Sequence, residues 1–90
     1  MKIVTIPKDG ASDASVKLIE LLKNNGDEVQ LGEAICEYET SKSIIELQSE
    51  FDGFIYNLYE SGSTIEIGEP FCLIFKRKIS ADEFESKKKE

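Results

Sequence analysis

The feature that most constrains this chain is an internal repeat. Residues 26–38, GDEVQLGEAICEY, match residues 62–74, GSTIEIGEPFCLI, in their Gly, Val/Ile, Gly-Glu and Cys positions at a constant offset of 36. Upstream, the same offset pairs Leu18 with Phe54 and Ile19 with Ile55. A third match, KIVTIP at residues 2–7 with SIIELQ at residues 43–48, has an offset of 41. A duplicated block of about 40 residues predicts two similar halves related by a pseudo-two-fold axis.

The segments within each half have the length and pattern of strands. Clusters of Gly, Asp, Asn, Ser or Pro, which form turns, bound the short apolar runs KIVTI, VKLIELL, AICEYE, SIIELQ, GFIYNLY and PFCLIFK. Residues 15–24, SVKLIELLKN, also fit a helix, but their repeat mate contains Gly and aromatic residues, which favour a strand. We therefore predict an all-β flattened barrel or sandwich, made of two roughly four-stranded antiparallel sheets with pseudo-two-fold symmetry.

Two units of the form Gly-x-x-Val/Ile-x-x-Gly-Glu begin at Gly26 and Gly62. Both glycines suit turns with positive φ, and Val29 and Ile65 are expected to point into the core. A phosphate-binding glycine loop is disfavoured because neither a helix N-terminus nor a lysine follows. We interpret both units as structural turns.

Charge and composition exclude several classes of function. The net charge of −7 argues against nucleic acid and anionic lipid, which both require basic surfaces. No apolar run approaches the ~18 residues of a membrane-spanning helix. Without histidine, Ser-His and Cys-His catalysis and His-metal sites are excluded, so we predict a non-catalytic chain with no metal site. Cys36 and Cys72 are predicted to be buried, reduced thiols in a cytoplasmic protein.

The chain changes character near its C-terminus. Residues 1–77 form the predicted domain, and residues 78–90 are a charged tail, expected to be disordered or to form a short helix. Ser80 to Glu83 has the pattern of a capping box, and Phe84 is the apolar residue that follows it.

Lys42 is the only Lys or Arg between Lys23 and Lys76. It lies between the two copies of the repeat, where Thr40, Ser41 and Lys42 are predicted to form a hairpin tip. A lysine at such a tip is exposed to solvent. From the residues alone, either a solvated surface lysine or a presented, modifiable amine fits this position.

Several of these motifs together resemble a lipoyl domain of the biotinyl/lipoyl-attachment family. The unit GDEVQLG is followed by ETSKS at residues 39–43, by SEFDG at residues 49–53 and by the second unit GSTIEIG. The opening IPKDG and the 16-residue steps from Gly10 to Gly26 and from Gly26 to Lys42 also fit the family. The resemblance covers about residues 2–76.

The resemblance implies covalent attachment of lipoate to Lys42, with Glu39, Thr40, Ser41 and Ser43 as flanking recognition residues. Ser41 stands where lipoyl domains usually have Asp, and Ser43 where they have Ala. The implied function is a swinging arm that carries acyl groups or reducing equivalents between the active sites of a 2-oxoacid-dehydrogenase-like complex.

The partners implied are a lipoate ligase or lipoyl transferase, together with dehydrogenase and acyltransferase enzymes. The loop expected to contribute to partner choice is the insertion that breaks the repeat: Lys8, Asp9, Gly10, Ala11, Ser12 and Asp13. Two alternatives stay open. One is an unmodified lipoyl-like module that binds proteins through its acidic face. The other is a biotin carrier, which fits less well because no methionine flanks Lys42.

Overall fold

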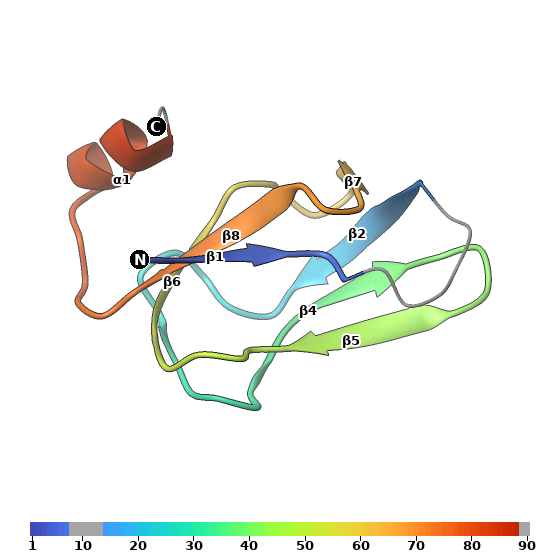
Figure 1. Ribbon diagram of the computed structural model, residues 1–90, viewed down its shortest axis with the longest axis horizontal. Helices are drawn as coiled ribbons and strands as arrows, with labels where there is room; N and C mark the ends of the chain where they lie inside the picture. Colours follow the sequence, from blue (N-terminus) through green and yellow to red (C-terminus); the bar gives the residue numbers. More distant parts are fainter. Residues whose placement is uncertain (8–13, 89–90) are drawn as a thin grey trace.

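The computed structural model describes residues 1–7 and 14–88, which form two stacked four-stranded antiparallel sheets and one short helix (Figure 1). The strands are β1 (Lys2–Thr5), β2 (Ser15–Leu21), β3 (Glu28–Val29), β4 (Ala34–Glu39), β5 (Ile44–Gln48), β6 (Gly53–Asn57), β7 (Thr64–Glu66) and β8 (Pro70–Phe75). The helix is α1 (Ala81–Lys88). The predicted all-β class is confirmed, and residues 15–24 form a strand with its following turn rather than a helix.

The strand order confirms the duplication. One sheet, here called sheet A, has the order β1-β8-β6-β3, and the other, sheet B, has the order β5-β4-β2-β7. The two orders become identical when each strand of the first repeat is exchanged with its mate in the second. Each sheet therefore contains two strands from each half of the chain. Neither half can close its own core without the other.

The repeat register upstream of the first turn differs from the sequence match by one residue. The amide of Gly26 donates to the carbonyl of Ile55 at 2.8 Å, and the amide of Gly62 donates to the carbonyl of Leu18 at 2.7 Å. Leu18 is therefore the structural mate of Ile55, not of Phe54 as predicted. The extra residue lies in a β-bulge just after Leu18 in β2, which a constant sequence offset cannot reveal.

The core between the sheets is closely packed and apolar. Alternate residues along each strand point inward, and the two turn units contribute Val29 and Ile65, which are 1% and 0% exposed as predicted. The buried members are Ile6, Val16, Leu18, Val29, Ile35, Cys36, Tyr38, Ile55, Ile65, Phe71, Cys72 and Ile74. Burial of these side chains is the main favourable contribution to the fold.

A second apolar cluster covers the outer face of sheet A. Tyr56 of β6 and Leu73 and Phe75 of β8 pack against Ile79 and Phe84, which follow the last strand. The Tyr56 hydroxyl accepts a hydrogen bond from the Ile79 amide and donates one to the Ile79 carbonyl, both at 2.9 Å. The polar groups of this contact are therefore satisfied although they are buried.

Helix α1 begins at a capped turn. The Glu83 amide donates to the Ser80 hydroxyl at 3.1 Å, and Arg77 forms an ion pair with Glu83 at 2.6 Å. The described part of the segment after residue 77 thus contains a helix that packs on sheet A. The domain boundary at residues 77/78 stays a prediction.

Candidate functional site

The hairpin between β4 and β5 presents the candidate lysine. The last paired residues are Glu39 and Ile44, and the four residues between them, Thr40 to Ser43, form the tip. Figure 1 shows this tip at the end of the molecule opposite the chain termini. Ser41, Lys42 and Ser43 are all exposed, whereas Thr40 is partly buried. The structure therefore brings Lys42 together with its four predicted flanking residues and places its side chain in solvent.

Hydrogen bonds within the tip fix its backbone. The Thr40 amide donates to the Ser43 carbonyl at 2.9 Å, and the amides of Lys42 and Ser43 both donate to the Thr40 hydroxyl at 3.2 Å. These bonds form a side-chain-stabilised turn of the kind that Ser and Thr favour. The predicted recognition loop, residues 8–13, lies outside the described residues.

Charged side chains cross the outer face of sheet B beside the tip. Glu37 lies directly opposite Glu46 on one neighbouring strand and opposite Glu20 on the other, so three carboxylates form a row. In the adjacent row, Glu39 lies opposite Lys17. The sequence indicated Glu39 as a residue flanking Lys42 but did not reveal the row that includes Glu20. The alternation of polar residues along β2 was the available signal for Glu20, because it predicts which residues share this outer face.

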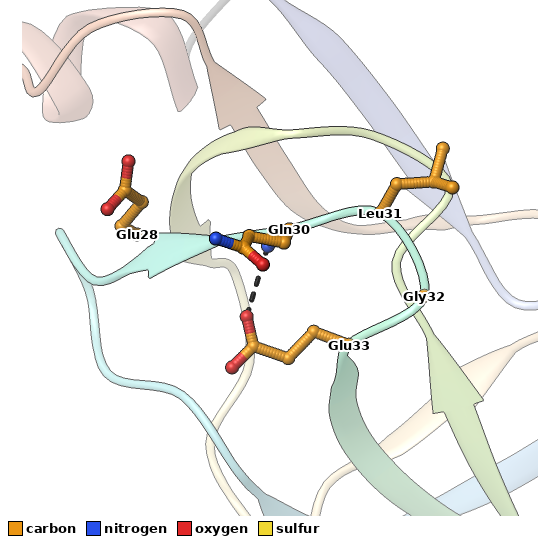
Figure 2. Close-up of a pocket in the computed structure, with 5 residues that line it drawn as sticks. All are labelled: Glu28, Gln30, Leu31, Gly32 and Glu33. Carbon is orange, nitrogen blue, oxygen red and sulfur yellow. Dashed lines mark hydrogen bonds between the residues drawn. The ribbon is translucent and has the colours of Figure 1, made fainter.

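The turn between β3 and β4 forms a shallow hollow on the surface (Figure 2). There the Gln30 amide donates to a Glu33 carboxylate oxygen at 3.0 Å, and Lys23 forms an ion pair with Glu33 at 2.6 Å. The hydrogen bond and charge of Lys23 lower the pKa of Glu33 below its ordinary value. The polar side chains of this hollow thus stabilise the turn, in agreement with the structural interpretation of the glycine units.

The two cysteines occupy equivalent positions on β4 and β8. Both Cys36 and Cys72 are free and fully buried, as predicted. Burial raises the pKa of the Cys36 thiol to about 12 and raises the pKa of Cys72 above its ordinary value as well. Both therefore stay protonated at neutral pH and pack as small apolar groups.

Two further findings concern metals and membranes. Within residues 1–7 and 14–88, no three acidic, cysteine or histidine side chains gather in an arrangement that holds a metal ion. The helix found in the described part of the chain is too short and too polar to cross a membrane.

The fold is a small β-barrel sandwich with an exposed lysine, Lys42, on a hairpin tip. A family model described as "Biotin-requiring enzyme", the biotin/lipoyl family, matches residues 2–74. The chain belongs to this family.

Similar proteins are components of 2-oxoacid dehydrogenase complexes. The chain is 33% identical, over 92% of its length, to a dihydrolipoyllysine-residue acetyltransferase component of the pyruvate dehydrogenase complex of Dictyostelium discoideum, of which the match covers 14%. Dihydrolipoyllysine-residue succinyltransferase components of 2-oxoglutarate dehydrogenase complexes are also similar. The one from Staphylococcus saprophyticus is 36% identical over 82% of the chain and 18% of the relative. The one from Bacillus subtilis is 34% identical over 77% and 17%. The chain thus spans less than a fifth of these relatives.

Proposed function

We propose that this chain is a lipoyl carrier domain in which lipoate is attached through an amide to Nζ of Lys42. The observation that carries this proposal is the position of Lys42 on an exposed hairpin tip of a barrel from this family. The relatives support lipoate in particular, because their names describe acyltransferase components that act through a dihydrolipoyllysine residue. The flanking residues Glu39, Thr40, Ser41 and Ser43 form the surface that an attaching enzyme meets.

Attachment requires a reachable amine rather than a buried, catalytic one. The Lys42 amine attacks the carbonyl carbon of a lipoyl adenylate held by a lipoate ligase or lipoyl transferase. The new C–N bond forms as the bond to the phosphate oxygen of AMP breaks, and the amine loses a proton to solvent. Lys42 suits this step because its four-carbon stem extends from an exposed turn.

Once bound, the lipoyl group supplies a dithiolane that accepts acyl groups and electrons. This chain's own residues hold the base of that arm at the end of a rigid hairpin. Tethering raises the effective concentration of the arm at each dehydrogenase or acyltransferase active site that it reaches. The proposed role is therefore presentation, with the catalytic groups supplied by partner enzymes. The buried, reduced cysteines fit a reducing compartment such as the cytoplasm.

Intact mass spectrometry tests this function. The chain is co-expressed with a lipoate ligase or with a biotin ligase, and the mass of the purified protein is measured. We expect a lipoyl increment on the wild type and on Lys17→Arg, a matched substitution of an exposed lysine on β2, but none on Lys42→Arg. A biotin increment would favour the biotin carrier. An unmodified mass with both enzymes would exclude both carriers and favour a protein-interaction module.

A further inference from the structure

The tip that carries Lys42 is a four-residue turn, Thr40 to Ser43. Two-residue hairpin loops favour turns with positive φ, for which Gly, Asn and Asp are preferred, whereas four-residue loops are most often built around a type I turn. The tip contains no Gly, Asn or Asp, and no non-glycine residue in the described part of the chain has positive φ. The tip therefore closes through hydrogen bonds rather than through a residue of special conformation. One of them joins the Thr40 amide to the Ser43 carbonyl at 2.9 Å.

The Thr40 hydroxyl adds three further hydrogen bonds to the turn. It accepts hydrogen bonds from the amides of Lys42 and Ser43 and donates one to the Ser43 carbonyl, all at 3.2 Å. One hydroxyl thus connects the start of the turn with both residues of its second half. The hydrogen bond to the Lys42 amide fixes the backbone from which the modified side chain extends.

Thr40 is the least exposed residue of the tip. Thr40 is partly buried, whereas Ser41, Lys42, Ser43 and the following Ile44 are exposed. Thr40 is thus the tip residue best placed to couple the turn to the body of the domain.

We propose that Thr40 is a positioning residue for the modification of Lys42. The proposal rests on the proposed function, because it concerns the same lysine. An enzyme that accepts the tip in one conformation binds only the fraction of molecules that already adopt it, and its apparent affinity falls with that fraction. The Thr40 hydroxyl keeps that fraction high. It acts through the geometry of the Lys42 backbone and does not touch the reacting amine.

The test compares Thr40→Val with Thr40→Ser. Valine keeps the branched shape and removes the hydroxyl, whereas serine keeps the hydroxyl. With a lipoate ligase, we expect Thr40→Val to raise KM by about tenfold with kcat unchanged, the effect of losing one or two hydrogen bonds. Thr40→Ser should restore most of the wild-type KM. The matched control is Thr64→Val, an exposed threonine on β7, which should leave KM unchanged.

Amide hydrogen exchange gives an independent measurement. The amides of Lys42 and Ser43 should exchange slowly in the wild type and in Thr40→Ser, and faster in Thr40→Val. If Thr40→Val does not fold, unprotected amides at these two positions in the wild type overturn the inference. A wild-type KM for Thr40→Val, or a Thr40→Ser variant as impaired as Thr40→Val, also overturns it. An unmodified wild type instead overturns the proposed function, and the inference with it.

Discussion

Sheets A and B have equivalent strand orders but opposite outer surfaces. The outer face of sheet A carries Tyr56, Leu73 and Phe75, and the segment with α1 packs on it. The outer face of sheet B carries the carboxylate row of Glu20, Glu37 and Glu46 beside the Lys42 hairpin. The duplication preserves the core, while the outer faces have diverged. The apolar face stabilises the domain, and the charged face lies next to the site of proposed modification.

One difference between the two sheets within the barrel lies at Gly53. Its structural mate is Val16, because Gly53 pairs with Val29 as Val16 pairs with Ile65. A Cβ atom on Gly53 would lie 2.4 Å from the Phe75 carbonyl oxygen, and the φ of +152° is unfavourable for other residues. We expect Gly53→Ala to lower the free energy of unfolding by about 3–4 kcal/mol, through a backbone clash combined with strain.

Gly68→Ala is the matched control in chemical denaturation. Gly68 also has positive φ, at +95°, but nothing lies within 4 Å of its Cβ position. Its substitution should cost about 1–2 kcal/mol, the conformational strain alone. Equal losses for the two variants would contradict a close approach between β6 and β8 at Gly53.

The second prediction concerns the cover on sheet A. Phe84 is 6% exposed, and its ring centroid lies 5.1 Å from that of Tyr56. We expect Phe84→Ala to lower the free energy of unfolding by about 2–3 kcal/mol, at the lower end for buried aromatic residues because the helix lies at the surface. The variant should also bind more of a hydrophobic dye, since loss of the Phe84 ring uncovers the outer face of sheet A.

The exposed Ser86 of the same helix provides the comparison. Ser86→Ala truncates an exposed side chain of α1, so it should change the free energy of unfolding by less than about 0.5 kcal/mol. If Phe84→Ala were as stable as Ser86→Ala, α1 would not be packed on sheet A in solution. The contrast between the two outer faces would then disappear.

The repeat predicted most of the barrel because the repeated residues determine the structure of their own short segments. Turn glycines, inward Val29 and Ile65, and the run at residues 34–39 all specify structure through neighbouring residues. The register at Leu18 was wrong because a β-bulge depends on pairing between distant strands. The capping box at Ser80 indicated a helix, but no local signal shows that the Tyr56 hydroxyl binds the backbone of Ile79.

The candidate site was predicted about as fully as the fold. The position of Lys42 between the repeats predicted an exposed tip, which the structure contains. That Lys42 is modified stays a prediction. The bonds of the Thr40 hydroxyl depend on the backbone conformation of the turn, and the sequence only indicated Thr40 as a flanking residue. The row of carboxylates could be recognised only from the strand register, because Glu20 and Glu37 are 17 residues apart but lie opposite each other.

The smallest expected effects concern the charged outer face of sheet B. They separate its contribution to the stability of the domain from its contribution to association with an enzyme. Glu37 has a carboxylate opposite it on both sides, so Glu37→Gln should raise the free energy of unfolding by about 0.5 kcal/mol at low salt. Glu39→Gln should instead lower it by a few tenths of a kcal/mol, at roughly the size of an exposed ion pair, because Lys17 lies opposite. Both changes should shrink as salt screens the charges, which urea denaturation at two ionic strengths measures.

A stabilising Glu37→Gln would mean that the native carboxylate row is kept at the expense of stability. Electrostatic attraction mainly raises association rates, and it does so most at low salt. The same variant should therefore be modified more slowly by an attaching enzyme with a basic surface, with the difference vanishing at high salt. A variant that is more stable and is modified at the wild-type rate at every salt concentration would show that the acidic face does not serve attachment. The two outer faces would then differ in packing alone.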